Sequence, residues 1–252
     1  MSEETTLEAY ADKQELIDNI DEIFETTVKD LLVEQDAVHV VLTGGTVGIA
    51  LLENIDPGHV LDWSRIHLWW GDERFVPAGF VPAGHADRNE GQATAALIHR
   101  LPIPAENVHR MPASDAGLSL DEAVDAYDDE LAKYWPELPE FDITFLGVGP
   151  DAHIASLFPG LEGIDVDDCA VIAVRNSPKP PAERISLTLP ALNNSKNIWV
   201  VAAGADKADA IYAAFTSENP SEAPVSAVEG TEETVFFTDE AAAQRLIEEE
   251  EV

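Results

Sequence analysis

The sequence predicts an α/β fold with a largely parallel sheet, and two observations carry this prediction. Short apolar runs rich in β-branched and aromatic residues, which are typical of buried strands, recur along the chain. Amphipathic patterns with helical spacing separate these runs, and strands that alternate with helices favour parallel pairing. No break in composition divides the 252 residues, so we expect one domain over residues 1–252.

The expected elements follow one another in a regular order. Helices are expected over residues 7–33, after residue 48, up to residues 97–98, over 118–135, around Lys207 and after residue 238. Strands are expected at residues 38–42, 66–70, 141–148, 170–174, 184–189, 198–204 and 235–238, with a shorter one at 108–111. Three of these strands end at glycine-containing turns that carry polar residues, and the candidate functional residues lie there.

The charge balance limits the choice of partners. Forty-nine acidic and 14 basic residues give a formal net charge of −35. Such a surface repels nucleic acid and anionic membranes, so neither is expected as a partner. The acidity itself is typical of a highly soluble surface and is compatible with adaptation to salt. Because cations are scarce, an Arg or Lys in a glycine- or proline-rich loop is a candidate for anion binding.

Targeting and redox features predict a cytoplasmic protein. No run approaches 18 consecutive apolar residues, so no membrane span is expected. The N-terminal segment lacks the basic start and apolar stretch of a secretory signal. The one cysteine, Cys169, excludes an internal disulfide framework and fits a reducing compartment.

A glycine-rich turn follows the strand at residues 38–42. It consists of Thr43, Gly44, Gly45 and Thr46, and an apolar helix comes next. A strand, a glycine turn and a helix start aim backbone N–H groups at an anion, so we expect a cradle for phosphate or a sugar phosphate. The alternative is a tight connection without a ligand. The turn is not a P-loop, because no Gly-Lys-Ser/Thr follows at the required spacing.

Three charged residues, Asp72, Glu73 and Arg74, directly follow the strand at residues 66–70. If both strands are parallel, these residues lie at the same sheet edge as the glycine turn. Arg74 either contacts a ligand there or pairs with one of the two acids. Beyond it, the pentapeptide FVPAG occurs twice over residues 75–84, which indicates a lengthened loop rather than a repeat architecture.

The strand at residues 141–148 is followed by an acid and an imidazole. It breaks at Gly147 and Gly149 and then presents Asp151 and His153. A carboxylate at this spacing influences the orientation and basicity of an imidazole, which favours a catalytic role for His153. The glycines also match a dinucleotide-binding pattern formally, but the match is on a late strand, with a proline and an acid where the pyrophosphate would approach.

Other chemistries have weaker support. The seven histidines show no HExxH motif and no paired Cys/His spacing, which argues against a metal site. No G-x-S-x-G motif is present, and Ser156 is expected to be a hydroxyl facing a helix rather than a nucleophile.

Four segments, taken together and in this order, resemble the 6-phosphogluconolactonases. They are Leu42–Thr46, Gly71–Pro77, Leu146–Gly160 and Ser177–Ser186, and the resemblance covers roughly residues 38–237. It implies a Rossmann-like three-layer α/β/α fold of the glucosamine-6-phosphate isomerase type, with a mostly parallel sheet and small inserted elements. It also implies hydrolysis of 6-phospho-D-glucono-1,5-lactone in the oxidative pentose phosphate pathway, without a metal or organic cofactor. The partner would be a small phosphosugar lactone, and the protein a monomer or small homo-oligomer.

The resemblance and the sequence together suggest roles for the candidate residues. His153 would be the general base and Asp151 would orient it. The backbone N–H groups of Gly44 and Gly45 would stabilise the oxyanion. The residues expected to bind the substrate and its phosphate are Thr43, Gly44, Gly45, Thr46, Asp72, Glu73, Arg74, Lys179 and Arg184.

The chain departs from the family pattern at the catalytic turn, where the family commonly has Asp-Gly-His and this chain has Ala152. That turn must therefore tolerate a Cβ atom. Val47 also stands where the family often has proline. A related amino-sugar deaminase is less plausible, because Phe158 replaces the acid that those enzymes carry before the proline. A non-catalytic sugar-phosphate sensor remains a further alternative, against which the Asp151/His153 pair argues.

Overall fold

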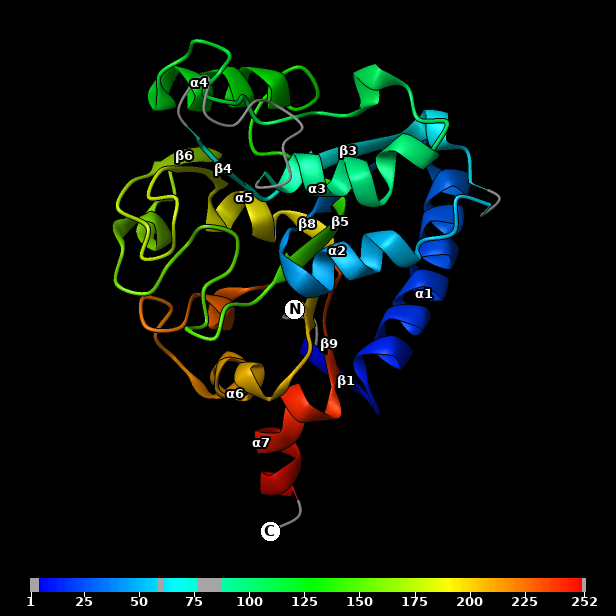
Figure 1. Cartoon of the computed structure of the whole chain (residues 1–252), viewed down its shortest axis with the longest axis vertical. Helices are drawn as coiled ribbons and strands as arrows, with labels where there is room; N and C mark the ends of the chain where they lie inside the picture. Colours follow the sequence, from blue (N-terminus) through cyan, green and yellow to red (C-terminus); the bar gives the residue numbers. More distant parts are fainter. Residues whose placement is uncertain (1–4, 59–60, 77–87, 251–252) are drawn as a thin grey trace.

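Six parallel strands form the main sheet, in the order β1-β9-β8-β5-β2-β3 (Figure 1). They are β1 Thr5–Tyr10, β2 Val38–Leu42, β3 Ile66–Trp70, β5 Phe141–Gly147, β8 Ser195–Ala202 and β9 Glu233–Asp239. This computed structural model describes residues 5–58, 61–76 and 88–250. Every neighbouring pair in the sheet is parallel, which confirms the predicted α/β class.

Helices lie on both faces of the main sheet and give three layers. They are α1 Lys13–Glu34, α2 Gly45–Asn54, α3 Asn89–Ala96, α4 Leu120–Leu131, α5 Leu189–Asn193, α6 Ala208–Thr216 and α7 Glu240–Glu250. Figure 1 shows α1 and α2 on one side of the sheet and α5 and α6 on the other. Because both faces are covered, central strands such as β5 are apolar throughout most of their length and almost fully buried.

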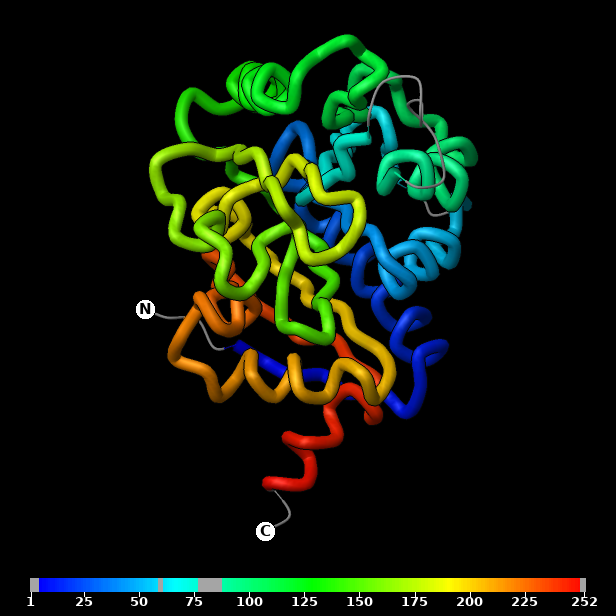
Figure 2. Tube along the Cα trace, turned by 60° about the vertical axis from the view of Figure 1, so that its left-hand side comes forward, coloured from blue at the N-terminus to red at the C-terminus, as the bar shows by residue number. Residues whose placement is uncertain are grey.

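A small antiparallel sheet of three strands accompanies the main one. Its order is β4-β7-β6, with β4 at Asp72–Arg74, β6 at Val171–Val174 and β7 at Arg184–Leu187. The charged residues after β3 are therefore a short strand, and Arg74 lies opposite Arg184 across the β4–β7 pair. Figure 2 shows the chain between β5 and β8, coloured green to yellow, looping over one side of the molecule.

The N-terminal helix is shorter than the sequence predicts. Residues 5–10 form β1, which pairs with β9 at the edge of the sheet, so Leu7 belongs to a strand. The helix α1 begins at Lys13 because the Asp12 carboxylate caps it, accepting hydrogen bonds from the N–H groups of Gln14 and Glu15. The apolar periodicity from Leu16 onward fits a helix, but it does not show where the helix starts.

Three other local predictions need correction. The helix α2 begins at Gly45, inside the glycine turn, and not after Gly48. Residues 108–111 do not form a strand, although Val108 makes an isolated bridge to Leu68. No helix begins directly after His153, where Ile154 makes isolated bridges to Val148 and Leu157, and the Ser156 hydroxyl donates to Asp72 of β4 rather than facing a helix. The repeated FVPAG loop lies largely outside the described residues.

The strand order places a crevice beside β2 and β5. From β2 the chain continues to β3 on one side, and the later strands β5, β8 and β9 lie on the other side. In such sheets the ligand site lies outside the carboxyl ends of the strands where the order reverses. Separately, none of the described helices is long and apolar enough to cross a membrane.

Candidate active site

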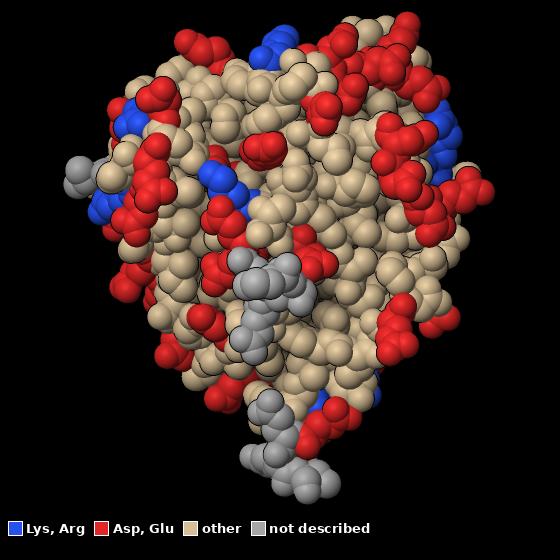
Figure 3. All heavy atoms as spheres, turned by 180° about the vertical axis from the view of Figure 1, so that it is seen from behind, with Lys and Arg blue, Asp and Glu red and all other residues tan. Residues whose placement is uncertain are grey.

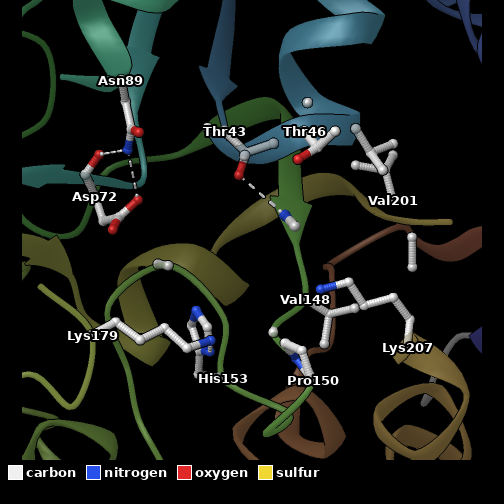
Figure 4. Close-up of a pocket in the computed structure, with 18 of the residues that line it drawn as sticks. Thr43, Thr46, Asp72, Asn89, Val148, Pro150, His153, Lys179, Val201 and Lys207 are labelled. Atoms are coloured by element: carbon white, nitrogen blue, oxygen red, sulfur yellow. Dashed lines mark hydrogen bonds between the residues drawn. The ribbon is translucent and has the colours of Figure 1, made fainter. Parts of the chain in front are cut away.

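A cavity of about 490 Å³ lies at the carboxyl ends of β2, β5 and β8 (Figure 4). Most of the residues predicted for the site meet there. The predicted residues that line it are Thr43, Gly44, Gly45, Thr46, Asp72, Arg74, His153, Lys179 and Arg184. The structure therefore brings together four segments that are far apart in the sequence.

The glycine turn connects β2 to α2 and contacts the end of β5. The hydroxyl of Thr43 accepts a hydrogen bond of 3.1 Å from the N–H of Gly147, at the end of the neighbouring strand. The first N–H groups of α2 have no intrahelical partners, as in any helix, and no side chain caps them. Because residues 44–48 line the cavity, this helix terminus offers donors to an anionic group there.

The side chains of Asp151 and His153 form a close pair. Oδ1 of Asp151 lies 2.5 Å from Nδ1 of His153. A carboxylate only accepts hydrogen bonds, so Nδ1 carries the proton and the neutral ring keeps its lone pair on Nε2. Gly149 makes this arrangement possible, because a Cβ atom there would lie 1.9 Å from Nδ1 of His153.

The electrostatic environment favours a neutral His153 and a charged Asp151. Burial lowers the pKa of His153 below 6.5, although the Asp151 carboxylate opposes this effect. Burial acts to raise the pKa of Asp151, but its hydrogen bonds to His153 and Lys179 outweigh that, and the pKa falls below 3.8. A neutral imidazole beside a carboxylate can accept a proton near neutral pH.

The Lys179 side chain reaches this pair from the loop after β6. Its Nζ lies 3.1 Å from both Oδ1 of Asp151 and Nδ1 of His153. The ammonium therefore contacts the Nδ1 edge of the imidazole, and Lys179 also lines the cavity. Arg184 lines the same cavity, and its guanidinium contacts backbone carbonyls of the Lys179 loop.

The Asp72 carboxylate connects three segments around the cavity. It accepts hydrogen bonds from the hydroxyl of Ser156 at 2.5 Å and from the side-chain amide of Asn89 at 3.1 Å. Oδ2 of Asp72 also lies 3.7 Å from Nη1 of Arg184. Ser156 is thus buried and holds the loop after His153 in place, a role that its position in the sequence did not indicate.

The Glu73 side chain does not reach the cavity. It is 1% exposed and accepts hydrogen bonds from the backbone N–H groups of Arg74, Asn89 and Glu90. The Arg88 guanidinium lies 3.6 Å from it. Alternate residues of a strand point to opposite sides, so Glu73 turns away from the side that Asp72 and Arg74 face. Its expected role in binding is replaced by support for the start of α3.

Sequence reasoning missed four polar residues that line the cavity, namely Lys13, Asn89, Asp206 and Lys207, of which the last two form an ion pair at 3.6 Å. Figure 4 shows Lys179 and Lys207 entering from opposite sides, with Lys207 on the side of Thr46. The position of Lys207 after the carboxyl end of β8, in a chain with few cations, was a usable signal. Lys13 looks like an ordinary helix residue in the sequence, so nothing marked it.

The catalytic turn accommodates the Cβ atom of Ala152 in a left-handed backbone conformation, with φ of 65°. Such a conformation costs a non-glycine residue about 1–2 kcal/mol. The turn is held by hydrogen bonds from the N–H of Ala152 to the carbonyl of Gly149 and from the N–H of Val225 to the carbonyl of Ala152.

As for metal ions, no group of three or more His, Cys, Asp or Glu in the described part of the chain is arranged to hold one.

Comparisons with known proteins agree on one family. Residues 11–237 match the family model described as glucosamine-6-phosphate isomerases/6-phosphogluconolactonase. A 6-phosphogluconolactonase of Streptomyces coelicolor is 40% identical, covering 98% of this chain and 96% of the relative. One of Mycobacterium leprae is 38% identical, covering 96% and 98%. The crystal structure of 6-phosphogluconolactonase from Thermotoga maritima superposes with a TM-score of 0.81 at 28% identity, covering 94% of this chain and 100% of that one.

Proposed function

The chain belongs to the 6-phosphogluconolactonase family of the glucosamine-6-phosphate isomerase superfamily, and we propose that it hydrolyses 6-phospho-D-glucono-1,5-lactone to 6-phospho-D-gluconate. This is a lactone hydrolysis of the oxidative pentose phosphate pathway. The observation that supports it best is that His153, paired with Asp151, lines a cavity that cations and a helix N-terminus also line.

Hydrolysis begins with water held against the lone pair on Nε2 of His153. The imidazole removes a proton as the water oxygen attacks the lactone carbonyl carbon. The ring oxygen then leaves as the carbonyl re-forms, and it takes the proton from the His153 imidazolium to become a hydroxyl of the product, which returns the imidazole to its neutral form. Asp151 keeps Nδ1 protonated and stabilises the imidazolium that forms during the attack.

The oxyanion of the tetrahedral intermediate needs donors close to the attacked carbon. We assign this role to the backbone N–H groups of Gly44 and Gly45, at the start of α2. Gly44 lies tightly against Asn89, since a Cβ atom on Gly44 would lie 2.1 Å from Oδ1 of Asn89. The Asp72–Asn89 contact thereby fixes the position of this turn.

The substrate phosphate binds on the cationic lining of the same cavity. Arg74 and Lys207 are the proposed ligands, with the hydroxyl of Thr46 and the helix N-terminus beside them. Lys13 lies close to this end, with its Nζ 3.5 Å from the backbone oxygen of Thr46. Lys179 lies nearer to the reacting carbonyl, because it contacts the Asp151–His153 pair.

One assay tests the proposed activity. Freshly prepared 6-phosphogluconolactone is added to the protein, and acid release is followed above the spontaneous rate. We expect a rate that the His153→Gln variant reduces about 10²–10⁴-fold, which is the range of general-base catalysis. The control is His99→Gln, since His99 is an exposed histidine outside the cavity. Full activity in His153→Gln would exclude His153 as the base, and ammonia release from glucosamine 6-phosphate would instead indicate a deaminase.

A further inference from the structure

The buried Phe158 ring contacts both the His153 imidazole and the Arg184 guanidinium. The ring centroids of His153 and Phe158 are 4.5 Å apart, with planes inclined by 29°. The guanidinium carbon of Arg184 lies 5.7 Å from the centroid of the Phe158 ring. Phe158 is 1% exposed, so its ring excludes water from the part of the imidazole that it covers.

The hydrogen bonds of Arg184 go mainly to the backbone of the loop that carries Lys179. Nε donates to the carbonyl oxygen of Pro181 at 3.3 Å, and Nη2 donates to those of Lys179 and Pro180 at 3.1 and 3.2 Å. The remaining terminal nitrogen, Nη1, lies 3.7 Å from the Asp72 carboxylate. The side chain is 9% exposed, which leaves little of it accessible to a bound phosphate.

These contacts connect Arg184 to the His153 imidazole along two separate routes. Arg184 holds the loop of Lys179, and the ammonium of Lys179 contacts Asp151 and His153. In the other direction, Arg184 lies against Phe158, which stacks on His153. The imidazole is therefore fixed at its Nδ1 edge by Asp151 and on its face by Phe158.

We propose that Phe158 and Arg184 are positioning residues for His153, and that Arg184 acts through Phe158 and the Lys179 loop rather than as a ligand of the substrate phosphate. The proposal rests on the proposed role of His153 as the general base. The aromatic face of Phe158 and the guanidinium of Arg184 together keep the His153 imidazole in one orientation and shield it from water. A misplacement of about 1 Å in a catalytic group can cost 10²-fold in rate.

Replacing Phe158 by leucine removes the aromatic face while keeping an apolar side chain. We expect a kcat at least about 10-fold lower with a similar KM, because the imidazole loses its fixed orientation. We also expect the pKa of His153, measured by NMR without substrate, to rise toward 6.5 as water reaches the ring. The signal of His153 is identified by its absence from the spectrum of His153→Gln.

Phe237→Leu is the matched control for this change. Phe237 is 2% exposed and makes one edge-to-face contact with Trp199, at 5.8 Å, outside the cavity lining. Phe237→Leu removes the same atoms as Phe158→Leu, also from a buried aromatic pair. Its kcat and the titration of His153 should match those of the wild type, even if its melting temperature falls.

Arg184→Lys tests the contacts of Arg184 with the Lys179 loop without creating a cavity in the core. A lysine keeps the charge but cannot reach three carbonyls with a planar fork, so the Lys179 loop loosens and kcat falls. The matched control is Arg65→Lys, because Arg65 also donates to three backbone carbonyls, those of Leu32, Gln35 and Asp36, far from the cavity. It should lose stability and keep the wild-type kcat.

The outcomes separate this proposal from the proposed activity. A raised KM with unchanged kcat in Arg184→Lys would make Arg184 a phosphate ligand and overturn the positioning role. An unchanged titration of His153 in folded Phe158→Leu would overturn the role of the aromatic face. If the wild type shows no lactonase activity, the proposed function fails, while the NMR titration still reports whether Phe158 and Arg184 control the imidazole.

Discussion

The absence of a side chain at Gly149 is as important to the site as the groups of Asp151 and His153. A Cβ atom at this position would lie 1.9 and 2.1 Å from Nδ1 and Cε1 of His153, and 2.4 Å from Oδ1 of Asp151. A methyl group would therefore occupy the place where the carboxylate meets the imidazole. The close approach of the backbone to these two side chains explains the glycine.

Gly149→Ala should disable the pair without unfolding the protein. The added methyl group displaces the imidazole at the edge of a cavity, where it has room to move, so we expect kcat to fall about 10²-fold. The melting temperature should change little. Gly163→Ala is the control, because the closest atom to its Cβ would be the end of the Ile172 side chain, at 2.9 Å. A kcat near that of the wild type in Gly149→Ala would show that the observed Asp151–His153 contact is unnecessary.

The cations of the cavity should separate into two kinetic classes. Arg74→Ala and Lys207→Met should mainly raise KM, by about 10–100-fold, since a hydrogen bond to a charged group contributes about 1.5–3 kcal/mol. Lys179→Met should mainly lower kcat, because Lys179 contacts Asp151 and His153. Steady-state kinetics with the lactone measures both constants. If Lys179→Met changes only KM, Lys179 binds the phosphate and not the catalytic pair.

At the scale of elements, the sequence predicts strands better than their surroundings. β2, β3, β5, β8 and β9 are found where apolar β-branched runs occur, because burial on both faces requires that composition. β1 is missed since it is an exposed edge strand with little apolar content. β4 is missed because its three charged residues are held by pairing with β7, which lies more than 100 residues away in the sequence.

The candidate site shows the same difference between residues marked by a local pattern and residues placed by tertiary packing. Residues in local motifs, such as the glycine turn and the Asp151–His153 pair, were predictable, because chain connectivity alone brings them to the sheet edge. The orientation of Glu73 away from the cavity and the contact of Ser156 with Asp72 depend on tertiary packing. No local pattern in the sequence encodes them.

Three stacked histidines, two of them on β2 and β3, predict sensitivity to acid. His39 and His67 stack at 4.7 Å, His67 and His109 at 5.2 Å, and Nδ1 of His67 lies 2.9 Å from Nε2 of His109. Burial and the neighbouring His67 lower the pKa of His39 to about 4. Burial also lowers the pKa values of His67 and His109, even though His109 contacts Glu130.

Stability should therefore fall as the pH decreases from about 6.5 to about 4. In that range the unfolded chain binds protons at these histidines and the folded chain does not, so protonation favours unfolding. His39 alone contributes about 3 kcal/mol across the window, at 1.36 kcal/mol per pKa unit. Denaturant unfolding at several pH values measures the slope, which His39→Gln should reduce and His99→Gln should not. Equal slopes in His39→Gln and the wild type would contradict the prediction.

At the scale of the whole molecule, charge repulsion opposes the compact state. Figure 3 shows acidic side chains spread over one face, with few basic ones between them. The net charge of −35 comes from acidic residues spread along the 252-residue chain, so a single ion pair neutralises only a small part of it. Self-repulsion of this kind destabilises a folded protein and is screened by salt.

The helix α4 shows this repulsion locally. Asp125 and Asp129 are exposed and four residues apart, and Asp128 lies between them. Burial and the charges of Asp129 and Asp125 raise the pKa of Asp128 above 3.8. Asp121, by contrast, pairs with Arg175 at 2.5 Å. The helix α4 therefore contains carboxylates that repel one another and also an acid, Asp121, that is paired and can serve as a control.

The melting temperature should rise with sodium chloride, most steeply below about 1 M, as the Debye length shrinks from about 10 Å at 0.1 M to about 3 Å. The double variant Asp125→Asn/Asp129→Asn should be more stable than the wild type at low salt, and the difference should shrink as salt is added. Asp121→Asn should show no such gain, because it loses an ion pair. Thermal unfolding across a salt series measures all three proteins. A wild-type melting temperature that is independent of salt would mean that the acidic surface carries no net repulsion in the folded state, and the double variant would then have no advantage at low salt.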